Sequence, residues 1–144
     1  MDMSMPPLPA RAVQPQLQIP ADTLARLKEA FDAFVQQQDG VQAAVLATVD
    51  GFEIASHSRK PSLSAENLAA MSSSLTAISS AVASEVSFKG CDRLLLESES
   101  GKIVFQPVRS VVPCTACVAV SSDVLLGRTL WALDEFARTL RALR

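Results

Sequence analysis

The feature that most constrains the fold is a change of hydrophobic period at residue 41. Every second residue from Val41 to Val49 is apolar and is expected on one face, and the dipeptide Asp50-Gly51 follows directly. Asp-Gly between two alternating segments indicates a β-hairpin with a type I′ turn, because both residues tolerate positive φ. The return strand is expected at residues 52–57, with one of its sides buried.

Helical periodicity occurs on both sides of this hairpin and again near the C-terminus. After Pro20, Asp22 is expected to cap a helix that ends at Gly40. The clearest helix spans residues 63–86 with Ser64 at its N-cap, and Ser122 is expected to cap the last helix. The apolar positions of the three helices are, in order, Leu24, Leu27, Phe31 and Phe34; Leu68, Met71, Leu75, Ile78 and Val82; and Leu126, Leu130, Leu133, Ala137 and Leu140.

The middle helix combines a stripe of large apolar side chains with a surface of small ones. We expect the stripe from Leu68 to Val82 to pack against the sheet of its own chain, which is the usual role of such a stripe. Alanine and serine fill most of the remaining positions. The small flanks therefore predict that another helix can approach closely.

Three further apolar runs are expected to be strands, at residues 91–98, 102–108 and 114–120. The resulting order is helix, hairpin, helix, three strands, helix. This order is typical of an α+β domain with a mostly antiparallel sheet covered by helices.

Composition excludes several classes of function. Residues 1–20 hold five of the eight prolines and are expected to be a flexible tail, with a single domain at residues 21–144. The net charge of -2 argues against a nucleic-acid partner. The apolar runs are too short for membrane insertion, and the absence of an export signal favours the cytoplasm.

Two segments carry a resemblance to a known family. They are residues 45–56, Val-Leu-Ala-Thr-Val-Asp-Gly-Phe-Glu-Ile-Ala-Ser, and residues 94–108, Leu-Leu-Leu-Glu-Ser-Glu-Ser-Gly-Lys-Ile-Val-Phe-Gln-Pro-Val. Together they look like a roadblock (dynein light chain) domain, similar to the bacterial regulators of Ras-like polarity and gliding GTPases, over residues 22–143. The resemblance implies a profilin-like, five-stranded sheet in the order 2-1-5-4-3, with the long helix on one face and the two terminal helices on the other.

The resemblance also implies a non-enzymatic homodimer that binds, regulates or scaffolds a small Ras-like GTPase. Two domains of the family commonly join at the third strand and the long helix, and an apolar edge strand invites such pairing. The expected dimer interface comprises Arg93, Leu94, Leu95 and Leu96 of the strand with Ser73, Ala77, Ser80 and Ser84 of the helix. The expected partner surface comprises Ser72, Thr76 and Ser79.

Two alternative functions belong to other classes. Cys91, Cys114 and Cys117 could serve a thiol redox or zinc-binding module, with His57 as a fourth ligand. If residues 114–120 form a strand, however, Cys114 and Cys117 point to opposite faces and cannot share a metal. The other alternative is a small-ligand sensor with a pocket between the sheet and the long helix. No P-loop or nucleophile elbow occurs, so we expect no catalytic centre and no cofactor.

Overall fold

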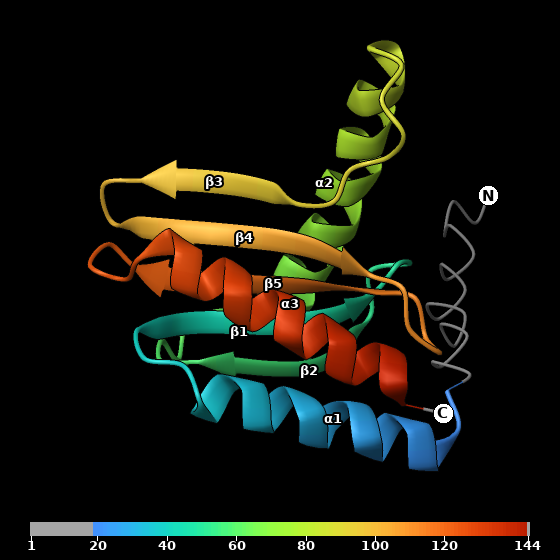
Figure 1. The fold of residues 1–144 in the computed structure, drawn as a ribbon. Coiled ribbons are helices and arrows are strands. Elements are labelled where there is room, and N and C mark those ends of the chain that lie inside the picture. The colour runs from blue at the N-terminus through green and yellow to red at the C-terminus, as the bar shows by residue number, and fades with distance from the viewer. Residues whose placement is uncertain (1–18, 144) are drawn as a thin grey trace, which may run out of the picture.

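The computed structural model describes residues 19–143 (Figure 1). The proline-rich tail predicted at residues 1–20 therefore lies, except for its last two residues, outside the described residues. The helices are α1 (Ala21–Gln36), α2 (Ala65–Glu85) and α3 (Leu126–Ala142), and the strands are β1 (Val41–Thr48), β2 (Glu53–Ser58), β3 (Leu94–Ser98), β4 (Gly101–Val108) and β5 (Cys114–Ser121).

The five strands form one antiparallel sheet in the order β2-β1-β5-β4-β3. Helix α2 crosses one face, and α1 and α3 lie side by side on the other (Figure 1). The fold class predicted from the sequence pattern and the strand order implied by the family resemblance are confirmed. The arrangement leaves β2 and β3 as the two edges of the sheet.

The hairpin between β1 and β2 is confirmed, but its turn is not type I′. Only Gly51 has positive φ, at 91°, whereas a type I′ turn needs a second such residue at Asp50. Thr48 closes the loop, because its N–H donates to the Phe52 carbonyl at 2.8 Å and its carbonyl accepts from Gly51 N–H at 2.9 Å. The register shifts between Leu46 and Ala47, which pair with Ala55 and Glu53, so β2 holds one residue more than β1 at this point. Glycine in the left-handed region is typical of such longer hairpin loops.

The predicted alternation along β1 holds from Ala43 but fails at Val41. A register shift against β5 separates these two residues, and Val41 joins the core beneath α1 and α3. Strand β1 is central, so both of its faces are buried: Val45 and Ala47 lie under α2, while Leu46 lies on the opposite face. Burial of a single face, which we expected for the return strand, therefore applies to β2 and not to β1.

Helix caps were only partly predictable. Ser64 caps α2 as expected, since its hydroxyl oxygen accepts a hydrogen bond from Asn67 N–H at 3.2 Å. The prediction for Asp22 is wrong because Pro20, with its fixed φ of -52°, already stands at the N-cap of α1. The prediction for Ser122 is wrong because a turn follows β5 and α3 begins only after Leu125.

The main core lies between the sheet and the α1/α3 layer. Phe136 of α3 stacks on Phe34 of α1, with ring centroids 4.7 Å apart, and meets Phe31 edge-on at 6.4 Å. Such aromatic contacts add to the area that the rings bury. The α1/α3 layer thus supplies large side chains that the protomer buries by itself.

Candidate protein-interaction surface

Strand β3 is an open edge of the sheet. Among residues 19–143, only β4 pairs with it, so its outer N–H and C=O groups have no strand partner. Leu94 is half-buried, while Leu95 and Leu96 are exposed by 40% and 44%. An apolar, unpaired edge is a ready template for another strand.

Register divides the side chains of β3 between the two faces. Leu96 pairs with Ile103, and Leu94 pairs with Phe105, which in turn pairs with Cys117 beneath α2. Leu95 instead pairs with Val104, a residue of the core under α1 and α3. Leu94 and Leu96 therefore extend the α2 face of the sheet to its edge.

Helix α2 is oriented differently from our expectation, because its large apolar stripe does not pack on the sheet. Met71, Ile78 and Val82 are exposed by 58%, 59% and 61%. Only Leu68 and Leu75 are half-buried. The prediction that the whole stripe covers its own sheet is wrong.

The sheet-facing seam of α2 consists of small side chains instead. Ala69, Ser72 and Ala83 are buried, and Thr76 and Ser79 are half-buried. Their spacings of three and four place them on one side of the helix. Small residues let the helix backbone approach the sheet closely, which leaves no room for the larger stripe.

Ser72 was expected on the partner surface and is instead fully buried. Its hydroxyl donates to the Leu68 carbonyl at 2.7 Å and also contacts the Cys117 thiol. Ser72 is therefore unavailable to a partner. Thr76 is half-buried and its hydroxyl donates to the Ser72 carbonyl at 2.9 Å, whereas Ser79 is half-buried without such a bond among the described residues.

The residues expected on the small flank of α2 differ in whether they are free to contact a partner. The Ser73 hydroxyl donates to the Val49 carbonyl of the hairpin, so this serine already has a partner within the protomer. Ala77, Ser80 and Ser84 are exposed. At 100° per residue, this flank lies on the opposite side of the helix from the apolar stripe.

The C-terminal end of α2 projects past β3 (Figure 1). It ends with Ser87 at a φ of 61°, and Phe88 N–H donates to the Ala83 carbonyl at 2.8 Å. This bond pattern is that of a Schellman C-cap. The turn leaves Val86 and Phe88 exposed by 57% and 69%, which prolongs the apolar stripe beyond the sheet.

Arg93 is connected to the opposite layer rather than free at the edge. Its guanidinium donates to Asp134 Oδ1 of α3 at 2.9 Å, and Gln106 Nε2 donates to the same oxygen at 3.1 Å. Gln106 Oε1 is buried without a hydrogen bond among the described residues. The ion pair joins the start of β3 to α3, a link that no local sequence signal could reveal.

The cysteines do not converge. Cys114 belongs to the core under α1 and α3, whereas Cys117 contacts Ser72 under α2, so the two thiols lie on opposite faces of β5. Burial raises the pKa of each to about 11. Cys91 is half-buried, and within residues 19–143 no three His, Cys, Asp or Glu side chains are grouped as metal ligands.

Sequence comparison decides the family. The Roadblock/LC7 domain model matches residues 27–113, which is more than half of the chain and contains β1 to β4 with α2. The chain belongs to the Roadblock/LC7 domain family. The predicted resemblance to roadblock proteins is thereby confirmed.

Solved structures agree with the Roadblock/LC7 assignment. Myxococcus xanthus MglB is similar with a TM-score of 0.77 at 14% identity, over 87% of this chain and 92% of that one. The gliding protein mglB from Thermus thermophilus gives 0.75 at 15%, covering 91% and 97%. A Roadblock/LC7 domain from Streptomyces avermitilis gives 0.70 at 17%, covering 79% and 93%. At these identities the likeness establishes the fold, and no curated protein matches the sequence.

In this Roadblock/LC7 chain, sequence reasoning missed the outward stripe of α2 and the Asp134 partner of Arg93. The apolar residues Val86 and Phe88 just after the helix were an available signal for the stripe, because a helix that packs inward rarely continues into exposed apolar residues. In the part of the chain that the structure covers, no helix is long and apolar enough to cross a bilayer.

Proposed function

We propose that this Roadblock/LC7 protein is a non-enzymatic homodimer that binds a small Ras-like GTPase and regulates or scaffolds it in the cytoplasm. No cofactor takes part. The interface comprises the β3 edge and α2, so that two sheets join edge to edge and the α2 helices of both protomers lie on the same side.

The observation that carries the proposal is the apolar surface shared by α2 and β3. Met71, Ile78 and Val82 expose large apolar side chains along α2, Phe88 does so just after the helix, and Leu96 does so at the edge strand. Large exposed apolar areas mark interaction sites in proteins. An unpaired β3 beside them supplies backbone donors and acceptors that only a strand can satisfy.

Within this dimer we assign roles to the expected residues. Leu94 and Leu96 lie on the α2 face of the edge, Leu95 lies on the other face, and Arg93 stays bound to Asp134. The exposed flank of Ala77, Ser80 and Ser84 lies outside the contact made by the stripe and is left open for the GTPase. Thr76 and Ser79 contribute to the GTPase surface only where their half-buried side chains reach solvent.

The proposal that the partner is a GTPase rests on membership of the Roadblock/LC7 family. Roadblock proteins are similar to regulators of Ras-like GTPases, and the solved neighbours include a gliding protein and an MglB described in a tetrameric arrangement. The net charge of -2 also disfavours nucleic acid as the partner.

Dimerisation is tested by sedimentation velocity over a concentration series that spans the micromolar range. The natural chain should sediment as a dimer, and Leu96→Lys, which places a charge on the edge, should shift the equilibrium toward the protomer. Val111→Lys adds the same charge at an exposed apolar residue in the loop between β4 and β5 and serves as the matched control. A natural chain that stays a lone protomer contradicts the proposal.

GTPase binding is tested by capture from native lysate with GDP or a non-hydrolysable GTP analogue, followed by reconstitution of the retained GTPase with purified protein. We expect direct binding that differs between the two nucleotides and is weakened by Leu96→Lys. If a verified dimer retains no GTPase, the proposal of GTPase binding is contradicted, while the proposal of a dimer is not affected.

A further inference from the structure

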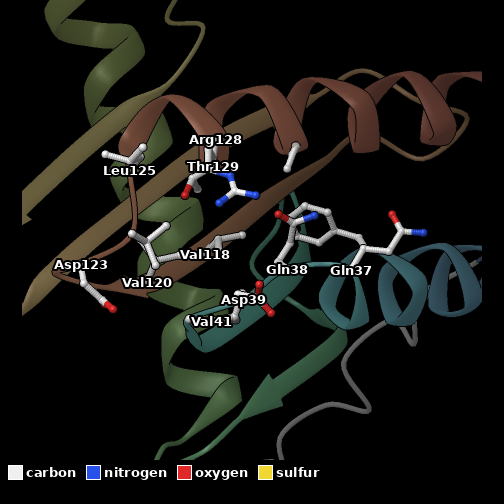
Figure 2. Close-up of a pocket in the computed structure, with 14 residues that line it drawn as sticks. Gln37, Gln38, Asp39, Val41, Val118, Val120, Asp123, Leu125, Arg128 and Thr129 are labelled. Atoms are coloured by element: carbon white, nitrogen blue, oxygen red, sulfur yellow. The ribbon is translucent and has the colours of Figure 1, made fainter.

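A cleft of about 360 Å³ opens between the C-terminal end of α1 and the first turns of α3 (Figure 2). It lies on the sheet face opposite α2, and not between the sheet and the long helix where a sensor pocket was expected. Val118 and Val120 of β5 and Phe34 of α1 form an apolar floor and wall. Its volume is at the small end of the range of about 300 to 1,000 Å³ that ligand sites occupy.

The α3 side of the cleft is electropositive. Figure 2 shows the Arg128 guanidinium directed from α3 toward the cleft, and no described residue forms an ion pair with it. The N-terminus of α3 contributes the positive end of its dipole, and neither a side-chain cap nor an acidic residue in the first turn neutralises it.

Thr129 adds an unpartnered polar group to the same side of the cleft. Its side chain lines the cleft and is only 5% exposed, yet within residues 19–143 its hydroxyl has no hydrogen bond. The hydroxyl oxygen is not among the enclosed unpaired atoms of the described residues, so it opens onto the cleft although the rest of the residue is buried. A ligand oxygen seated beside Arg128 could accept a hydrogen bond from it there.

The opposite rim is electronegative. Asp39, in the connection from α1 to β1, faces Arg128 across the cleft in Figure 2, and Asp123 lies in the turn after β5. The Lys102 ammonium, which donates to the Ser122 and Val124 carbonyls, offsets part of the charge of Asp123, whereas Asp39 has no such neighbour among the ion pairs of the described residues. The hydrogen bond from the Ser121 hydroxyl lowers the pKa of Asp123, so this carboxyl is ionised at neutral pH. Asp39 forms no ion pair with any described residue.

The geometry points to this cleft as a binding site for a free amino acid with an apolar side chain. The ligand carboxylate pairs with Arg128 and accepts a hydrogen bond from Thr129, its ammonium pairs with Asp39, and its side chain lies on Val118 and Val120. The site goes beyond the proposed GTPase function and depends on neither β3 nor α2.

Charge on the two rims selects among ligand classes. A nucleotide or another polyanion is repelled by Asp39 and Asp123, and a purely apolar molecule leaves Arg128 and Thr129 unpaired. A peptide N-terminus offers the ammonium without the neighbouring carboxylate. Only a zwitterion satisfies both rims over an apolar floor.

The test uses the full-length chain labelled with nitrogen-15 and titrated with three matched probes. They are L-phenylalanine, L-phenylalaninamide, which lacks the carboxylate, and 3-phenylpropanoate, which lacks the ammonium. We expect amide shifts at Gly40, Val118 and Thr129, and about tenfold tighter binding of the zwitterion than of either half-ligand.

Variants assign each charge to its rim. Arg128→Gln should abolish the preference for L-phenylalanine over the amide, and the pair Asp39→Asn with Asp123→Asn should abolish the preference over 3-phenylpropanoate. Thr129→Val, which keeps the shape but removes the hydroxyl, should weaken carboxylate probes only. Arg141→Gln, at the far end of α3, is the matched control and should change nothing.

The proposal is overturned if no probe shifts cleft residues at millimolar concentration, if all three bind equally, or if Arg128→Gln leaves the preference intact. Dispersed spectra of the variants establish that they are folded. Sedimentation of the same samples reports the dimer separately, so failure of one proposal is distinguishable from failure of the other.

Discussion

Two layers of helices cover the sheet, and they do so with side chains of opposite size. On the α1/α3 side, Phe31, Phe34 and Phe136 are directed inward and buried. On the α2 side, alanine and serine face inward, while Met71, Ile78 and Val82 face outward. The first layer stabilises the protomer, and the second leaves its large apolar residues exposed.

This contrast separates folding from association within one small domain. Burying large side chains against the sheet is the main source of folding free energy. A helix held by small side chains contributes less to that free energy, but it positions an apolar surface rigidly. The two layers should therefore respond differently to mutation, and the following predictions test that difference.

The largest loss of stability is expected in the α1/α3 layer. Phe136→Ala removes a ring that contacts Phe31 and Phe34, and we expect the free energy of unfolding to fall by about 3–5 kcal/mol. Chemical denaturation followed by circular dichroism measures it. A loss below about 1 kcal/mol would show that this layer is not the main core.

The outer stripe of α2 should control association rather than folding. The double change Ile78→Asp with Val82→Asp places two charges in the proposed interface, and we expect the dimer dissociation constant to rise at least about a hundredfold, or about 3 kcal/mol. Sedimentation velocity measures it, and circular dichroism should stay unchanged.

The matched control for the stripe is Ser80→Asp with Ser84→Asp, which adds the same charges to the same helix on its small flank. We expect a much smaller effect there. If the flank variant raises the dimer dissociation constant more than the stripe variant does, the interface lies on the flank, as we expected from the sequence.

The small seam under α2 predicts a third difference. Ala69 is fully buried, so Ala69→Leu overpacks the contact with the sheet and should lower the unfolding free energy by about 1–3 kcal/mol. Ala77→Leu makes the same change on the exposed flank and should stay within about 0.5 kcal/mol. Equal effects in thermal or chemical unfolding would show that the seam tolerates larger side chains.

The smallest effect concerns the thiols beneath the two layers. Burial raises the pKa of Cys114 and Cys117 to about 11, so both thiols should react slowly with an alkylating reagent in a Cys91→Ala background. Between about pH 8 and pH 10 the reaction rate should rise about tenfold for each pH unit, because the thiolate fraction grows by that factor. Cys117, under the thinner layer, should react several-fold faster than Cys114. Mass spectrometry after timed alkylation measures both, and faster reaction of Cys114 would reverse the comparison.

Much of the fold could be predicted because local periodicity and turn residues determine it. The alternation along β1 from Ala43 onward, Gly51 in the hairpin and Ser64 at the start of α2 are short-range features, and the structure contains all three. The caps at Asp22 and Ser122 failed because neighbouring residues, Pro20 and the turn after β5, compete for the same role.

The candidate surface was harder to predict than the fold. Sequence pattern locates the stripe on α2, but it cannot say whether Ile78 or Ala69 faces the sheet, because both sides of the helix are apolar. That choice depends on how closely the helix approaches a sheet built from distant residues. The partner of Arg93 stands 41 residues away, and the cleft residues Asp39 and Arg128 meet only through the fold.

The ion pair between Arg93 and Asp134 joins the edge of the sheet to the helix layer that covers one of its faces, since one partner precedes β3 and the other belongs to α3. In the proposed dimer, a strand that docks beside β3 would fix the backbone next to Arg93 and, through its guanidinium, would restrain α3. Assembly at the sheet edge would then be measurable in α3, where hydrogen exchange can serve as a reporter.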